Sequence, residues 1–104
     1  HAGHVRIVVD MTVLEDLQLV TVTPAIRAER GLQGDQGALV VGIAPRTAEA
    51  TGLREGDVIV GLDRRRVATA TDLSAFFDDL RPSDAFRIWV ERNGQTAYTD
   101  LVYR

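Results

Sequence analysis

Short runs of apolar residues with alternating polar positions recur along the chain, which predicts a β-rich domain with a few helices. The runs that favour strands through β-branched and aromatic residues are 5–9, 17–23, 39–43, 58–62, 86–91 and 95–103. Residues 11–14 either extend the first strand or bend away from it. Asn93-Gly94 between the last two runs is a strong signal for a tight hairpin, so these two strands are predicted to pair antiparallel.

Two short helical segments are predicted from their first and last residues. Thr23 is a suitable N-cap and is followed by proline at the first helical position, so a helix is expected over 24–30, ending at Gly31. Thr47 is expected to cap a single turn that ends where Gly52 adopts the left-handed conformation. Arg64, Arg65 and Arg66 are interpreted as a solvated turn.

One longer helix is predicted over 72–80, with Thr71 as its N-cap and an acidic residue in its first turn. Its apolar residues fall at i, i+3, i+4 and i+7, which places them on one stripe. These residues are Leu73, Phe76, Phe77 and Leu80.

Side chains in the predicted strand 86–91 alternate between its two faces. Phe86, Ile88 and Val90 share one face, and Trp89 lies on the opposite face. Trp89 is then either packed beneath the first strand or exposed as part of a contact surface.

Composition limits the classes of function. The chain of 104 residues is long enough for one domain with its own core, and its net charge of -3 does not indicate nucleic-acid binding. Without cysteine there are no disulfides and no thiolate metal sites, and His1 and His4 are too few to hold a metal. No apolar run approaches the ~20 residues of a membrane-spanning helix. Because no signal peptide is visible, we expect a fragment of a larger protein.

Catalytic chemistry is not predicted. A hydrolase triad needs a base beside its nucleophile, but the two histidines lie at the N-terminus and no G-x-S-x-G motif is present. The glycines of 31–37 lack the lysine of a phosphate-binding loop, and Asp78-Asp79 at the end of the main helix are interpreted as solvated. We therefore predict no catalytic residue, no metal site and no cofactor.

Residues 47–63, TAEATGLREGDVIVGLD, resemble the signature of PDZ domains. Residues 22–32, VTPAIRAERGL, and the ending DVIVGLDRRRV…IWVERNGQTAYTDLVYR are similar to PDZ domains of the HtrA/Deg family of trypsin-like periplasmic proteases. The resemblance begins near residue 17 and extends to the C-terminus. It implies an α+β fold, a partly open antiparallel β-barrel or sandwich of five to six strands with one main helix and one or two short helices. The PDZ domain is expected at 15–104, with 1–14 as an N-terminal strand or linker.

The resemblance also implies a groove between the strand after residue 16 and the main helix, where a peptide adds a strand to the open sheet edge. The terminal carboxylate of such a peptide would rest on N–H groups of the loop before the strand. Phe77 is expected in this groove rather than Phe76, and the small Ala70 and Ser74 leave room for an apolar ligand side chain. The implied peptide-binding residues are Leu17, Gln18, Leu19, Val20, Thr21, Ala70, Ser74 and Phe77.

The sequence departs from the family pattern at the carboxylate loop. Gln18 stands where glycine is usual, and it is expected to adopt a positive φ only at a cost. Glu15 and Asp16 precede it and would repel a bound carboxylate. An internal segment of an unfolded protein, or an intramolecular partner, is therefore favoured over a free C-terminus.

Two functions remain open at this point. The first is a non-catalytic module that captures or senses polypeptide segments, or C-termini of unfolded proteins, for a parent serine protease in the periplasm. Its partners would be those peptides, the protease domain and other subunits. The alternative is an assembly or regulatory module, in which the sheet edge or the Trp89 face contacts a neighbouring domain or subunit without binding C-terminal peptides.

Overall fold

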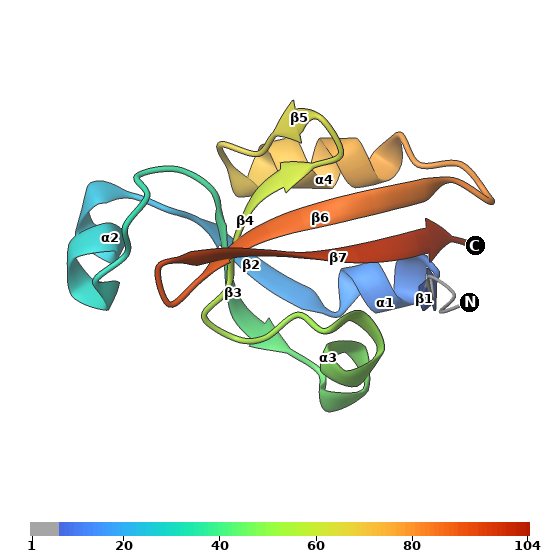
Figure 1. Cartoon of the computed structure of the whole chain (residues 1–104), viewed down its shortest axis with the longest axis horizontal. Coiled ribbons are helices and arrows are strands. Elements are labelled where there is room, and N and C mark those ends of the chain that lie inside the picture. Colours follow the sequence, from blue (N-terminus) through green and yellow to red (C-terminus); the bar gives the residue numbers. More distant parts are fainter. Residues whose placement is uncertain (1–6) are drawn as a thin grey trace.

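The computed structural model describes residues 7–104, which form a seven-stranded mixed sheet with four helices around it (Figure 1). The helices are α1 (Met11–Glu15), α2 (Pro24–Arg30), α3 (Pro45–Thr51) and α4 (Ala70–Asp78). The strands are β1 (Ile7–Val9), β2 (Leu17–Thr21), β3 (Ala38–Ile43), β4 (Val58–Leu62), β5 (Arg65–Arg66), β6 (Ala85–Arg92) and β7 (Gln95–Tyr103). The predicted PDZ-like α+β class is confirmed, and the strand count rises to seven because the two-residue β5 joins the six predicted runs.

The order of strands across the sheet is β1-β7-β6-β4-β3-β2, and β5 pairs with β4 outside this path. β1 pairs parallel with β7, whereas β2, β3, β4, β6 and β7 are joined by antiparallel pairings. The two edges of the sheet are therefore β1 and β2. The β2 edge lies beside α4, which is where the candidate site is built.

Local capping explains α2 and the hairpin. The Thr23 hydroxyl accepts a hydrogen bond from the Ile26 N–H at 3.2 Å, and Gly31 ends the helix at φ 65°. Asn93 and Gly94 have φ values of 53° and 76°, the left-handed pair that a two-residue hairpin turn needs. Both predictions from the sequence are confirmed.

The main helix begins earlier than predicted. Its N-cap is Thr69 rather than Thr71, because the Thr69 hydroxyl accepts from the Asp72 N–H at 3.0 Å. The Asp72 carboxylate in turn accepts from the Thr69 N–H at 3.2 Å, which completes a capping box. The helix therefore starts at Ala70 and ends at Asp78, two residues before the predicted end at Leu80.

The cap of α3 was also assigned to the wrong residue. The helix starts at Pro45, with Ala44 as an N-cap that makes no side-chain hydrogen bond. Thr47 is buried inside the helix, where its hydroxyl donates to the Asp16 carboxylate at 3.0 Å. Gly52 ends the helix at φ 76°, as predicted.

One further segment differs from the sequence-based expectation, and for residues 11–14 the structure shows which of two alternatives holds. Arg65 and Arg66 form β5 instead of a turn, and Asp63 at φ 54° allows the chain to reverse before them. Residues 11–15 form α1 with Asp10 as its N-cap, so the chain bends away after β1. Of the first predicted strand, 5–9, residues 5 and 6 lie outside the described residues, as do His1 and His4. The division into 1–14 and 15–104 stays a prediction.

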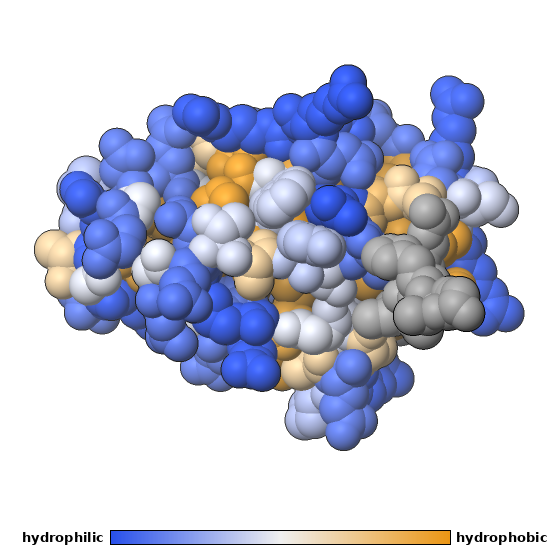
Figure 2. Space-filling view, in the orientation of Figure 1, coloured by the Kyte–Doolittle hydropathy of each residue, from blue (hydrophilic) through white to orange (hydrophobic). Residues whose placement is uncertain are grey.

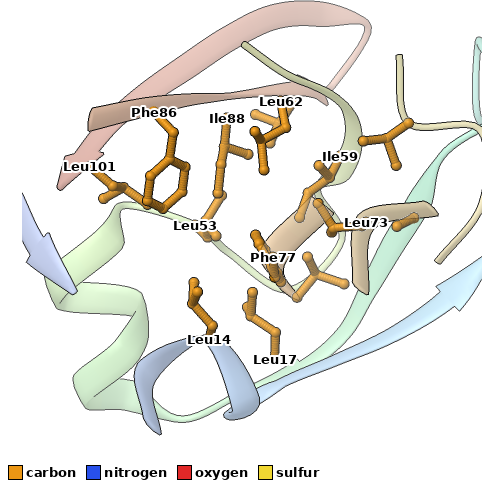
Figure 3. Packing of buried hydrophobic residues seen from close by; sticks show 14 of the residues in the cluster. Leu14, Leu17, Leu53, Ile59, Leu62, Leu73, Phe77, Phe86, Ile88 and Leu101 are labelled. Carbon is orange, nitrogen blue, oxygen red and sulfur yellow. The ribbon is translucent and has the colours of Figure 1, made fainter. Parts of the chain in front are cut away.

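β2 and α4 pack into the same hydrophobic core. β3 and β4 alternate, so that Val40 and Ile59 face the large cluster while Leu39 and Val58 face a smaller one that includes Ile26 of α2. Figure 3 shows side chains of the large cluster from α1, β2, β4, α4, β6 and β7 converging on one space. The labelled residues are Leu14, Leu17, Leu53, Ile59, Leu62, Leu73, Phe77, Phe86, Ile88 and Leu101. None of the helices within 7–104 has the length and hydrophobicity to cross a membrane.

Candidate functional site

The candidate site is the open edge of β2. On one side β2 pairs with β3, and within residues 7–104 no strand pairs with its other side. α4 packs beside this strand, and the Ala70 N–H donates to the Thr21 hydroxyl at 2.9 Å. This bond joins the end of β2 to the first turn of α4, so it fixes the spacing of the two elements at one end.

At the other end of β2, residues of α1, β2 and α4 line a cavity of about 260 Å³. Leu14, Leu17 and Phe77 are buried and supply apolar walls, and Phe77 is 7% exposed. Ser74 is exposed and sits at the mouth on α4. Among the described residues, the lining consists of Met11, Leu14, Glu15, Leu17, Leu19, Ser74, Phe77 and Asp78. The volume and the apolar walls suit one aliphatic side chain.

The implied site residues fall at four places in the structure. Leu17, Leu19, Ser74 and Phe77 meet at the cavity, and Thr21 and Ala70 meet at the hydrogen bond at the far end. Val20 packs on the other face of the sheet with the smaller cluster. The side chain of Gln18 lies against Gly42 of β3. The structure thus brings six of the eight together along one groove, and their role in binding stays a prediction.

Gln18 does not adopt the positive φ that glycine would supply at this position. Within residues 7–104 the non-glycine residues at positive φ are Asp63, Ser83 and Asn93. Instead the register of β2 against β3 shifts between Gln18 and Leu19. The Gln18 side chain packs over Gly42, where a Cβ atom would lie 2.5 Å from Gln18 Oε1. Because Gln18 is not at a positive φ, the expected cost does not arise.

Asp16 does not line the cavity. Its carboxylate accepts from the Arg46 guanidinium at 3.0 Å and from the Thr47 hydroxyl at 3.0 Å. The hydrogen bond from Arg46 has the larger effect and that from Thr47 the smaller, and together they lower the pKa of Asp16 below its ordinary value of 3.8. The negative charge of Asp16 is therefore offset by α3, and the expected repulsion of a ligand carboxylate falls to Glu15.

Three lining residues were missed by sequence reasoning. Met11 and Leu14 belong to α1, which the strand pattern of the N-terminus did not predict. Asp78 is exposed, as interpreted from the sequence, and it also lies four residues after Ser74 on the same face of α4. That spacing was the available signal.

The outer face of β6 and β7 carries the second candidate surface. The Trp89 and Tyr98 rings lie 5.2 Å apart, and the Arg87 guanidinium lies 3.9 Å from the centre of the Tyr98 ring. Trp89 is half-buried and Tyr98 is 53% exposed. Figure 2 shows this side of the molecule as a mosaic of hydrophilic, intermediate and hydrophobic residues. Within the described chain, no group of three or more His, Cys, Asp or Glu residues is placed to hold a metal ion.

An open sheet edge beside a helix, with an apolar cavity at one end, is the arrangement of modules that take up a peptide as an added strand. A family model for the PDZ domain matches residues 6–101. The chain belongs to the PDZ domain family, in the branch found in HtrA-type proteases. The prediction of a binding module is therefore confirmed.

Individual relatives show the same affiliation. The chain is 31% identical to the magnetosome formation protease MamE of Paramagnetospirillum magneticum, over 81% of its length. It is 33% identical to the serine protease HTRA1A of Danio rerio, over 83% of its length. It spans 12% and 19% of those two proteins. The solved structure of the HtrA-type protease AlgW with a decapeptide matches with a TM-score of 0.72 and 26% identity, over 84% of this chain and 27% of that one.

Proposed function

We propose that this domain binds extended polypeptide segments by strand addition at the open edge of β2. The observation that carries the proposal is the unpaired β2 edge beside α4, which ends at an apolar cavity of about 260 Å³. The relative AlgW was solved with a decapeptide, and this supports a peptide as the ligand class.

The groove supplies affinity and selectivity through different atoms. The N–H and C=O groups on the open side of β2 would pair with the peptide backbone, which is independent of sequence. Because side chains alternate along a strand, every second peptide side chain would face the groove. One aliphatic side chain would fill the cavity against Leu17, Leu19 and Phe77, whereas Gln18 and Val20 would contribute their backbone alone.

A bulky residue at the mouth of the cavity tests this assignment. Ser74→Trp should weaken the binding of a fluorescent apolar decapeptide by about tenfold or more, because the indole would occupy the cavity. The thermal midpoint should stay nearly unchanged, since Ser74 is exposed. Ala75→Trp is the matched control, because Ala75 is exposed on the same helix and does not line the cavity.

Fluorescence anisotropy and thermal unfolding decide between the outcomes. Equal affinity of Ser74→Trp, Ala75→Trp and the unmodified chain would place peptide binding elsewhere. A fall of many degrees in the midpoint of Ser74→Trp would mean that Ser74 supports the core. The same peptide with a free or an amidated C-terminus separates two modes of binding. Equal affinities would remove any need for a terminal carboxylate.

The exposed Tyr98 beside Trp89 favours one alternative, an assembly or regulatory module that contacts a neighbouring domain or subunit. In that case the domain would bind none of the peptides but would associate with increasing concentration. Analytical ultracentrifugation of the chain and of Tyr98→Ser tests this, because the substitution should abolish such association.

We also propose a setting for the domain. Its relatives include HtrA-type serine proteases, so the parent protein would be a protease of this type and the domain would present unfolded segments to its catalytic domain. A periplasmic location and a role in protein quality control follow from the same resemblance. Cell fractionation of the full-length parent protein, with a cytoplasmic marker as control, would test the location.

A further inference from the structure

Four carboxylates lie near the start of β2 and the end of α4. Two of them have a partner within the described chain, and two line the cavity. Asp16 accepts from Arg46 and Thr47, and Asp79 accepts from the Arg65 guanidinium at 3.2 Å. Both of these acids lie outside the lining of the cavity. Glu15 and Asp78 do line it, and both are exposed. Among residues 7–104 neither of them has a hydrogen bond or ion pair of its side chain.

Within residues 7–104, no arginine lines the cavity beside these two acids. Asp78 is moreover the last residue of α4, whose final turn carries no basic residue. A carboxylate at the C-terminal end of a helix is disfavoured by the helix dipole, whereas a cation there is favoured. The mouth of the apolar cavity therefore carries uncompensated negative charge from two side chains and a helix end.

We propose that Glu15 and Asp78 make this groove selective for peptides that carry Lys or Arg beside the apolar residue that fills the cavity. The inference rests on the proposed function, because it assigns a ligand class to the same groove. The aliphatic side chain would enter between Leu17 and Phe77, and the basic side chain would reach back to the rim. A ligand carboxylate at the rim would be repelled by the same two acids.

The expected effect is moderate because both acids are exposed to solvent. An exposed ion pair changes binding by roughly two- to fivefold, so two such pairs should give about tenfold. The preference should fall as salt rises, because mobile ions screen exposed charges at separations above roughly 10 Å in 0.1 M salt. A preference that arises from packing alone would not respond to salt in this way.

Matched peptides and matched variants test the proposal. The probe is an acetylated and amidated fluorescent decapeptide with a central leucine and an arginine two positions away on each side. Its partner carries citrulline, the uncharged isostere, in place of both arginines. Affinities are measured at low and high salt for the unmodified chain, Glu15→Gln, Asp78→Asn and the double variant. Asp79→Asn is the control, because it removes a neighbouring charge that is already paired with Arg65.

At low salt the unmodified chain should bind the arginine peptide about tenfold more tightly than the citrulline peptide. Each single variant should reduce this ratio to about threefold, and the double variant should bring it close to one, whereas Asp79→Asn should keep it. Equal binding of the two peptides by the unmodified chain, or a preference that survives in the double variant, would overturn the inference and leave peptide binding intact. If neither peptide binds, both the inference and the proposed function fail.

Discussion

The region around β4 and β6 and the region around β2 and α4 differ in whether their polar groups have partners. On the side of β4 and β6, Asp57 is 1% exposed and its carboxylate accepts from the Arg92 guanidinium at 2.8 and 2.7 Å. The same carboxylate also accepts from the Arg54 N–H at 2.9 Å. On the side of β2 and α4, one edge of a strand carries no partner strand within 7–104, and two rim acids have no partner there either.

This difference separates the region that stabilises the fold from the region proposed to bind a peptide. A buried polar group left without a partner destabilises a fold, so the supporting side satisfies its charges internally. An open edge remains compatible with stability because water can solvate it until a ligand strand takes its place. Substitutions on the supporting side should therefore lower stability and leave peptide affinity unchanged, and those at the groove should do the reverse.

The largest expected effect comes from the core strand that both sides share. Ile59 is fully buried in β4, and Ile59→Ala should lower the free energy of unfolding by about 2–5 kcal/mol. Urea unfolding measures the loss, and Val8→Ala is the control because Val8 is exposed on β1. A loss below about 1 kcal/mol would mean that β4 is not the central strand of the core. Peptide affinity of the folded fraction should not change.

The buried ion pair is the next test of the supporting side. Arg92→Met removes the guanidinium and leaves the Asp57 carboxylate buried with the Arg54 N–H as a donor, which should cost about 3 kcal/mol. The matched control is Arg65→Met, because Arg65 and Asp79 form a pair on the surface at 3.2 Å. An exposed pair contributes about 0–1 kcal/mol. Equal losses in the two variants would contradict the contrast between the two sides.

Much of the framework could be predicted from the sequence because its signals are local. Thr23 with a following proline set the start of α2, Gly52 set the end of α3, and Asn93-Gly94 set the last hairpin. Each signal rests on the conformation of one or two residues. The start of α4 was missed because Thr69 and Thr71 are equally good caps by residue type, although an acidic residue three positions later, Asp72, follows only Thr69 and was the available signal.

The groove was harder to predict because its chemistry depends on contacts between distant segments. Asp16 and Glu15 are adjacent, yet Asp16 pairs with Arg46 while Glu15 lines the cavity. Asp78 joins Glu15 there from the far end of α4. Nothing in the spacing of these residues indicates which acid meets a partner. Strand and helix patterns predict where the groove lies, but they do not predict the distribution of charge around it.

The smallest predicted effect concerns Asp16, which precedes β2 and bonds to Arg46 and Thr47 of α3. Arg46 and Thr47 lower its pKa in the folded chain, so the charged carboxylate stabilises the fold at pH values above 3.8, its ordinary pKa. That contribution is lost as pH falls through the lower pKa of the folded state.

Asp16→Asn should therefore be slightly less stable at neutral pH, and the difference from the unmodified chain should disappear in acid. Arg46→Met should behave in the same way, because it removes the main cause of the lowered pKa. Urea midpoints from neutral to acid pH measure the effect. Two curves that stay parallel through the acid range would show that Asp16 does not connect the groove to α3 through its charge.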